Sequence, residues 1–290
     1  MKYKVDNAVI MAAGTSSRFA PLSYEKPKAL IEVRGEILLE RQLRQLKEAG
    51  IDNILLVVGY KKEQFEYLKE KYGVTLIENK EYMVRNNNST IYAVKNYLNN
   101  SYVCSSDNYF VENPFESYVE DSYYAAVFSE KETKEWCMTE GADGYIDRVE
   151  IGGSKAWYML GHTFWNESFS KKFVEILEKI YEEPETRNLL WESIFMSHLD
   201  ELKMKMRKYP DNYIFEFDTL DELREFDETY ISNTRSKILK NAASELGCAE
   251  RDIKNVISIK NTNNAAAGCR FEVGDQHFEY NYESKEIRRI

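Results

Sequence analysis

The chain has 290 residues, of which 43% are hydrophobic, so it can bury a large core without disulfides or metal ions. Its 39 lysines and arginines face 49 aspartates and glutamates, and the formal net charge of -10 opposes non-specific attraction to nucleic acid or to an anionic membrane. Because no apolar stretch has the length of a membrane span or a signal segment, we expect a cytoplasmic protein that binds neither nucleic acid nor a membrane.

The first part of the chain alternates apolar strands with amphipathic helices. The run 7–13 (NAVIMAA) ends at Gly14 and is typical of a strand buried on both faces. A helix over 36–49 follows, since leucines recur there on one face. Further strands and helices alternate over the ranges 54–58, 65–68, 74–77, 89–98 and 102–106. This alternation predicts an α/β fold, a doubly wound, mixed but mostly parallel sheet of Rossmann-like type, whose ligands bind at the carboxyl ends of the strands.

The pattern changes after residue 123, where shorter strands and two helices indicate the completion of the same sheet with an insertion. A capping box at Thr219-x-x-Glu222 opens a further helix. We predict a main domain over 1–230 and a small α+β extension over 231–290, made of a helix and a hairpin that turns at Gly274-Asp275. Sixty residues with few core positions hardly stand alone, so the extension should pack on the main domain or on another subunit, which leaves a homodimer open.

The most informative motif follows the first strand. The stretch AAGTSSRFAPL begins at Ala12, and KPKAL follows at 26–30. A loop of small residues lets backbone N–H groups approach a phosphate chain, and two cations can neutralise a triphosphate. The loop is neither a Walker A sequence nor a G-x-G-x-x-G fingerprint, and a tight turn with two solvated cations is the alternative. The candidate phosphate-binding residues are Ala12, Ala13, Gly14, Thr15, Ser16, Arg18 and Lys28.

This loop, with its P-K-A-L continuation, resembles the sugar-nucleotide and CTP-dependent nucleotidyltransferases. The chain from about residue 7 to 230 resembles the bacterial CTP:phosphocholine cytidylyltransferases and the closely related 2-aminoethylphosphonate cytidylyltransferases, through the segments 59–74, 100–109, 215–226 and the surroundings of Trp136. The resemblance implies an enzyme that transfers CMP from CTP to phosphocholine or 2-aminoethylphosphonate and releases pyrophosphate. Residues 252–290 resemble the opening strands of a choline kinase, but they stop before any kinase catalytic loop.

Three acidic residues are candidate magnesium ligands. Asp107 follows an apolar strand directly after Ser106, and Glu216 and Asp218 alternate by two, so both point to one face of a strand. The family has its metal-binding acids at these positions, so the resemblance implies Mg²⁺ there, with Lys28, Arg18 and Asp107 as the catalytic residues. Asp107 could instead be a turn residue and Asp218 a helix N-cap. Ser105 stands where relatives often carry another acid, so the sequence does not decide whether one or two metal ions bind.

Asn88, Ser89 and Ser106 complete the predicted nucleotide site. Amides and a hydroxyl at the start of a helix can read the donor and acceptor edges of a base, as this region of the family does for cytosine, and helix capping is the alternative.

The predicted acceptor site comprises Trp136, His162, Trp191 and Glu192. Trp136 matches a family aromatic that contacts the choline head. Leu190 stands where the pneumococcal type of enzyme has a tyrosine, which favours a primary ammonium bound by a carboxylate over a quaternary one in an aromatic cage. A sugar-1-phosphate nucleotidyltransferase and a nucleotide-binding regulator without catalysis are the alternatives. Intact Lys28 and Asp107 argue against the regulator.

Overall fold

The computed structural model describes residues 2–262 and 265–290, and the chain divides into two compact units. The first unit contains the residues up to Gly14 together with Leu39–Glu216, and the second contains Thr15–Leu38 and Phe217–Ile290. The chain therefore passes from the first unit to the second after Gly14, returns after Leu38, and passes to the second unit again after Glu216. None of the helices in the described ranges has the length and apolar character that a membrane crossing demands.

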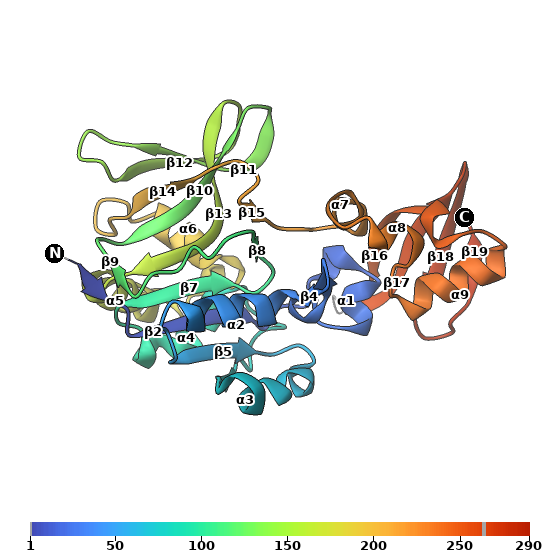
Figure 1. The fold of residues 1–290 in the computed structure, drawn as a ribbon, viewed down its shortest axis with the longest axis horizontal. Helices are drawn as coiled ribbons and strands as arrows, with labels where there is room; N and C mark the ends of the chain where they lie inside the picture. The colour runs from blue at the N-terminus through green and yellow to red at the C-terminus, as the bar shows by residue number, and fades with distance from the viewer. Residues whose placement is uncertain (1, 263–264) are drawn as a thin grey trace. The chain divides into compact units, whose positions relative to one another are not determined.

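A mixed sheet forms the centre of the first unit. Strand β2 (Asn7–Ala12) pairs in parallel with β5 (Ile54–Val58) on one side and with β7 (Ser101–Ser105) on the other, and β6 (Thr75–Glu78) extends the parallel part beyond β5. Figure 1 shows these strands side by side. Every residue of β5 is buried, as expected for a parallel strand covered on both faces. The predicted fold class is confirmed by this topology and by the structural relatives described below.

The antiparallel part of the sheet continues from β7 through β13 (Ala156–Trp165), which also pairs with β10 (Tyr123–Ser129) and β11 (Thr133–Glu140). A hairpin joins β11 to β12 (Ile146–Gly153), and β14 (Lys205–Tyr209) pairs in parallel with β10. Two short pairs complete the strands of this unit: β1 (Tyr3–Lys4) with β9 (Tyr118–Val119), and β8 (Tyr109–Phe110) with β15 (Ile214–Phe215).

Helix α2 (Leu38–Glu48) buries Leu39, Leu43 and Leu46 completely, which confirms the predicted apolar face. It begins two residues later than predicted, because Glu36 and Ile37 form a strand. The other helices of this unit are α3 (Tyr67–Tyr72), α4 (Asn88–Val94), α5 (Glu167–Ile180) and α6 (Trp191–Met196), with the 3-10 turns η3 (Lys62–Phe65), η4 (Lys95–Tyr97) and η5 (Pro184–Asn188). Trp165, Phe173 and Trp191 are among the core residues of this unit.

The second unit begins with a run of short elements: η1 (Ser17–Phe19), α1 (Leu22–Glu25), η2 (Lys28–Leu30), β3 (Glu32–Val33) and β4 (Glu36–Ile37). Its C-terminal part contains α7 (Leu220–Phe226), α8 (Thr229–Ser232), α9 (Lys237–Leu246) and η6 (Glu250–Asp252). An antiparallel sheet follows in the order β16 (Ile253–Lys260), β17 (Ala266–Val273), β18 (Gln276–Asn281) and β19 (Ile287–Arg289). The predicted hairpin is present, since Phe271 pairs with Phe278 and Gly274 turns with a φ of 58°.

The boundaries of the two units differ from the predicted boundary at residue 230. Residues 15–38 belong with the C-terminal part because Glu25, Glu32 and Arg34 all bond to residues beyond 217. Such contacts between distant parts of the sequence leave no local signal in composition. The division into a nucleotidyltransferase domain over 1–230 and a choline-kinase-like extension over 231–290 stays a prediction.

Candidate functional site

The AAG loop lies at the carboxyl end of β2. Ala12 and Ala13 are buried, and the Ala13 carbonyl accepts a hydrogen bond of 3.0 Å from the Tyr60 amide after β5. A Cβ on Gly59 would lie 2.9 Å from that carbonyl, so glycine lets the two loops approach. Nothing lies within 4 Å of a Cβ built on Gly14. Gly14 thus has free space on its Cβ side, and it lies at the carboxyl end of the strand, the end at which ligands of a doubly wound sheet bind.

Arg18 and Lys28 lie in the second unit, and both face Asp218. Nη1 of Arg18 lies 2.5 Å from Oδ2 of Asp218, and Nζ of Lys28 lies 3.7 Å from Oδ1. The Lys28 side chain is 4% exposed, whereas the Arg18 side chain is 74% exposed. A buried ammonium needs a counter-charge, and Asp218 supplies one. The two cations predicted to bind a triphosphate thus share a carboxylate.

The cap of helix α7 is not Asp218 but the neighbouring Thr219. The Thr219 hydroxyl accepts from the amide of Glu222, whose carboxylate accepts in return from the Thr219 amide, so the predicted capping box is present. Asp218 is therefore not the N-cap of this helix.

Asp107 and Glu216 belong to the first unit. The antiparallel pairing of β8 with β15 sets Tyr109 opposite Phe215, so Glu216 lies beside Asn108. Nδ2 of Asn108 donates to Oε2 of Glu216 at 3.2 Å, and Asn108 is 2% exposed. Strand pairing therefore brings Glu216 against the residue that directly follows Asp107, although 108 positions separate Asn108 from Glu216 in the sequence. The sequence did not predict Asn108 as a site residue, because a single asparagine after an aspartate matches no pattern that indicates binding.

The donors near Asp107 suit a hard divalent cation. Carboxylate and amide oxygens are the ligands that such cations prefer, and Oδ1 of Asn108 is buried with no hydrogen-bond partner among the described residues. Within the described ranges, no three Asp, Glu, His or Cys side chains gather closely enough to hold a metal ion. Asp107 and Glu216 lie in the first unit and Asp218 in the second, so the three-carboxylate magnesium site stays a prediction.

The side chains of Asn88 and Ser89 donate hydrogen bonds to backbone carbonyls of the protein. Asn88 is fully buried and donates to the carbonyls of Thr186, at 2.8 Å, and Leu189. The Ser89 hydroxyl, also buried, donates to the carbonyl of Asn86 at 2.7 Å. These bonds fix α4 against the segment that precedes α6. The side-chain donors of Asn88 and Ser89 are thus used within the protein, whereas Oδ1 of Asn88 is buried with no hydrogen-bond partner among the described residues; the base-reading role of both residues stays a prediction.

Two of the predicted acceptor residues are core residues. His162 is fully buried, and its Nε2 lies 2.8 Å from the Tyr123 hydroxyl; burial lowers the pKa of His162 to about 3, so the ring is neutral. Trp191 is 1% exposed and stacks on Tyr124 with the ring centroids 5.7 Å apart. The acceptor-binding roles predicted for His162 and Trp191 are corrected, because neither side chain has a free face.

Glu192 and Trp136 remain available. Glu192 is half-buried and accepts from Nδ2 of Asn87 at 3.0 Å and from the Tyr124 hydroxyl at 3.5 Å. Burial raises the pKa of Glu192 to about 7. Burial also raises the pKa of Tyr124, and the charges of Glu192 and Glu216 raise it further. Trp136 is half-buried on β11. The first unit thus places the Glu192 carboxylate beside the Tyr124 hydroxyl, and a carboxylate attracts an ammonium group.

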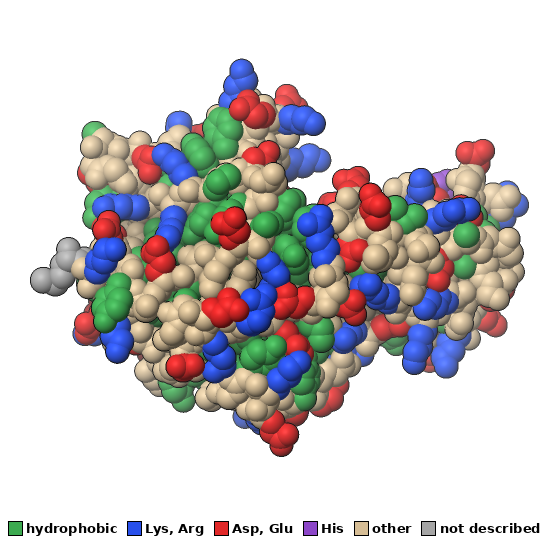
Figure 2. Space-filling view, in the orientation of Figure 1, with side chains coloured by type: hydrophobic (Ala, Val, Ile, Leu, Met, Phe, Trp, Pro, Cys, Tyr) green, Lys and Arg blue, Asp and Glu red, His purple; other side chains and the backbone are tan. Residues whose placement is uncertain are grey.

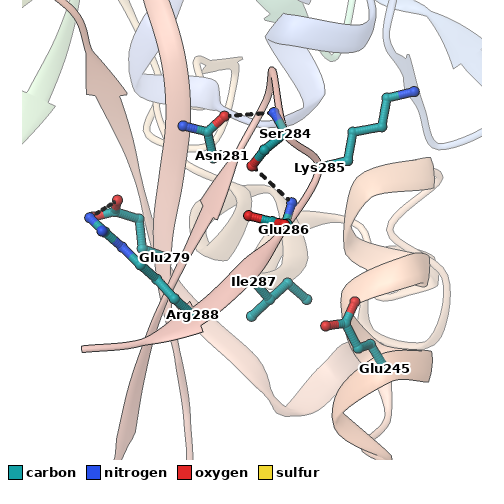
Figure 3. Close-up of a pocket in the computed structure, with 8 residues that line it drawn as sticks. All are labelled: Glu245, Glu279, Asn281, Ser284, Lys285, Glu286, Ile287 and Arg288. Carbon is teal, nitrogen blue, oxygen red and sulfur yellow. Dashed lines mark hydrogen bonds and ion pairs between the residues drawn. The ribbon is translucent and has the colours of Figure 1, made fainter.

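A hollow of about 510 Å³ lies elsewhere, in the extension. Figure 3 shows Glu245 of α9 opposite the hairpin of β18 and β19, with Glu279 bonded to Arg288. Most of its lining side chains are exposed and their charges are mixed: Glu245, Glu279, Asn281, Ser284, Lys285, Glu286, Ile287 and Arg288. It contains none of the residues predicted to carry the reaction. Figure 2 likewise shows acidic and basic side chains interspersed on the face in view. Selectivity for an anion on this face must therefore come from individual cationic residues and not from a broad positive surface.

Comparison with known proteins decides the family. Residues 8–138 match the MobA-like NTP transferase domain. The chain is 37% identical over 221 residues to the choline-phosphate cytidylyltransferase of Streptococcus pneumoniae. The matched region covers 76% of this chain and 96% of the relative. It is 35% identical over 239 residues to the 2-aminoethylphosphonate cytidylyltransferase of Lancefieldella rimae, with 79% and 95% covered. The chain belongs to this family of bacterial cytidylyltransferases.

Solved structures agree with the assignment to the cytidylyltransferases. The structure of CTP:phosphocholine cytidylyltransferase from S. pneumoniae superposes with a TM-score of 0.75 at 36% identity, covering 78% of this chain and 99% of that one. The inositol-1-phosphate CTP transferase from T. maritima, at 15% identity and a TM-score of 0.60, covers 77% and 93% and shares the fold. The resemblance inferred from the AAG loop and the later segments is confirmed. About a quarter of this cytidylyltransferase has no counterpart in the pneumococcal relative.

Proposed function

We propose that this cytidylyltransferase transfers CMP from CTP to a small phosphate or phosphonate amine and releases pyrophosphate. The family membership gives the reaction class. The observation that supports this activity in the present chain is the pairing of buried Lys28, which follows the AAG loop, with Asp218. A cation that is withdrawn from water and paired with a carboxylate can exchange that partner for a polyanion. We therefore assign Lys28 and Arg18 to the triphosphate, together with the backbone of Ala12 to Ser16 and the hydroxyl of Ser106.

The chemistry asks for positioning and charge neutralisation. An acceptor phosphate or phosphonate is already an anion at neutral pH, so its attack on the α-phosphorus of CTP needs no strong general base. Arg18 and Lys28 hold the triphosphate and neutralise the pyrophosphate that leaves. Enzymes of this family use a divalent metal. We propose Mg²⁺, which when bound neutralises charge on the phosphates, and Asp107, Glu216 and Asp218 would hold it.

For the acceptor we propose 2-aminoethylphosphonate. With Trp191 and His162 in the core, Trp136 is the remaining aromatic among the predicted acceptor residues, and position 190 carries leucine. Three methyl groups of a quaternary ammonium need several apolar walls, whereas a primary ammonium needs hydrogen-bond acceptors. Glu192, whose carboxylate accepts from the Tyr124 hydroxyl at 3.5 Å, provides such an acceptor. The site chemistry thus favours the substrate of the L. rimae relative over that of the S. pneumoniae relative.

A parallel turnover experiment tests the acceptor. kcat/KM is measured with CTP and, in turn, 2-aminoethylphosphonate, phosphoethanolamine and phosphocholine. We expect the primary amines to exceed phosphocholine by roughly tenfold to two-hundredfold, which corresponds to about 1 to 3 kcal/mol for one ammonium contact. A preference for phosphocholine by that margin would show that the remaining aromatics close a cage without residue 190, and the phosphonate proposal would be dropped.

A further inference from the structure

The segment that carries Arg18 and Lys28 has no core of its own. Residues 15–38 form only short turns, the four-residue helix α1 and two-residue strands, and they belong to one unit with Phe217–Ile290. The turn η1, which includes Arg18, packs against β16 of the extension. Since a run of such short elements does not order itself in isolation, its contacts with residues 217–290 contribute to its order.

Glu25 makes the most specific of these contacts. It lies three residues before Lys28, and its carboxylate accepts from the first groups of helix α9: the amide of Lys237 at 2.9 Å, the amide of Ile238 at 3.1 Å, and the hydroxyl of Ser236. A carboxylate at a helix N-terminus satisfies amides that lack a partner within the helix and interacts favourably with the helix dipole. Glu25 thereby joins the phosphate-binding segment to the extension through a polar, directional contact.

Further contacts flank the same segment. The ring of Tyr24 stacks on Tyr282 with the centroids 3.8 Å apart and the planes at 17°. Downstream of Lys28, Nη1 of Arg235 in the extension donates to the carbonyl of Glu32 at 3.0 Å. The Tyr230 hydroxyl donates to the same carbonyl and the Arg34 amide donates to Asp227 at 2.7 Å, although both partners precede the extension. Lys28 therefore lies between two attachment points, one on residues 24 and 25 and the other on residues 32 and 34.

We propose that residues 231–290 serve the transfer reaction by holding Arg18 and Lys28 in place for the triphosphate, with Glu25 as the positioning residue that links α9 to them. This inference rests on the proposed function. The physical reason is preorganisation: a cation whose backbone is already ordered gives up less conformational entropy when it binds a phosphate chain. The extension acts on nucleotide affinity and contributes no group to the reacting atoms.

The test compares full-length variants. Glu25→Gln keeps the shape of the side chain but removes the charge and one acceptor, so an N–H of the new amide faces the N–H of Lys237 or Ile238. We expect KM for CTP, and the dissociation constant of CTP measured by calorimetry without acceptor, to rise about tenfold while kcat stays within about twofold. Ser236→Ala alters the same contact from the side of the extension, so the double variant Glu25→Gln/Ser236→Ala should cost less than the sum of the single variants.

Glu245→Gln, at the other end of α9, is the matched control and should leave KM for CTP unchanged. If Glu25→Gln and Ser236→Ala both bind CTP like the control, the positioning role is wrong. An equal loss in kcat and in acceptor binding would also contradict it, because that pattern indicates general disorder. Should the unmodified protein bind CTP but turn over none of the acceptors, the proposed function fails, and calorimetry on the same variants still decides the role of Glu25.

Discussion

The carboxylate of Asp218 lies 2.5 Å from Nη1 of Arg18, and the same group faces Lys28 at 3.7 Å. Arg18 and Lys28 lie ten residues apart on one short segment, whereas Asp218 comes from the far end of the chain. A triphosphate carries more negative charge than one carboxylate, so its binding can draw both cations away from Asp218. The aspartate would then be available to a cation on the phosphates, which is the role proposed for it.

Replacement of Lys28 by methionine should remove most turnover. Methionine retains much of the apolar volume of this buried side chain but cannot neutralise a phosphate, so we expect kcat to fall at least about a hundredfold. Steady-state kinetics with CTP measure the loss, and circular dichroism checks the fold. Lys26→Met, two positions away at an exposed site, is the control. Near-normal kcat in Lys28→Met would remove this lysine from the catalytic site.

Asp107→Asn should lower activity by roughly two orders of magnitude or more and raise the magnesium concentration needed for half-maximal rate, because a neutral amide binds a divalent cation less strongly than a carboxylate does. The measurement is a magnesium titration of the initial rate. Asp52→Asn, whose side chain is 82% exposed before β5, provides the comparison. Identical magnesium curves for the Asp107 and Asp52 variants would contradict the assignment.

Glu192→Gln should make the protein more stable at high pH and less able to bind its acceptor. The pKa of Glu192 is raised from 4.5 to about 7, so the folded state prefers the protonated form, and its stabilising effect is present below pH 4.5 and lost as pH rises through 7. At pH 8 the variant should gain at most about 3 kcal/mol, and at pH 4 almost nothing. Urea unfolding at both pH values measures the gain.

The same Glu192 variant should raise KM for the amine acceptor, since the ammonium loses its counter-charge. For the unmodified enzyme, acceptor affinity should likewise fall as the pH drops below 7 and Glu192 becomes protonated. If acceptor KM is indifferent both to the substitution and to pH between 6 and 8, Glu192 does not bind the ammonium.

His162→Gln tests a residue that the structure removes from the acceptor site. Because burial lowers the pKa of His162 to about 3, neutral histidine stabilises the fold above pH 6.5, and this contribution is lost as pH falls toward 3. The variant should therefore unfold less steeply with acid, be less stable at pH 7, and bind the acceptor with an unchanged KM. A large rise in acceptor KM with an intact fold would return His162 to the site.

The sequence predicted the parallel half of the fold well, because β2, β5 and β7 are continuous apolar runs whose burial needs no partner to be recognised. The β11–β12 hairpin was missed. Most of its residues are exposed or half-buried and many are charged, with Cys137, Met138 and Ile146 as the buried ones, so the apolar pattern is weak.

Within the site, residue type alone could not distinguish side chains that share a motif. Asn88 and Ser89 follow Asn86 and Asn87 directly, yet the turn of α4 buries Asn88 and Ser89 and leaves Asn86 exposed. Trp191 and Glu192 are neighbours on α6, and only the glutamate lies near the tyrosine hydroxyl. Long-range pairing determines the rest: β8 with β15 brings Asn108 to Glu216, and α9 reaches Glu25 from more than two hundred positions away.

The most direct test of the account is the identity of the product formed from CTP. Purified protein is incubated with magnesium, 2-aminoethylphosphonate and each of CTP, UTP, ATP and GTP in turn, with pyrophosphate quantified and the organic product weighed by mass spectrometry. The account predicts one pyrophosphate for each CMP-aminoethylphosphonate formed, from CTP far more than from the other triphosphates. Equal use of all four nucleotides, or pyrophosphate release without a CMP adduct of any of the three amine acceptors, would contradict it.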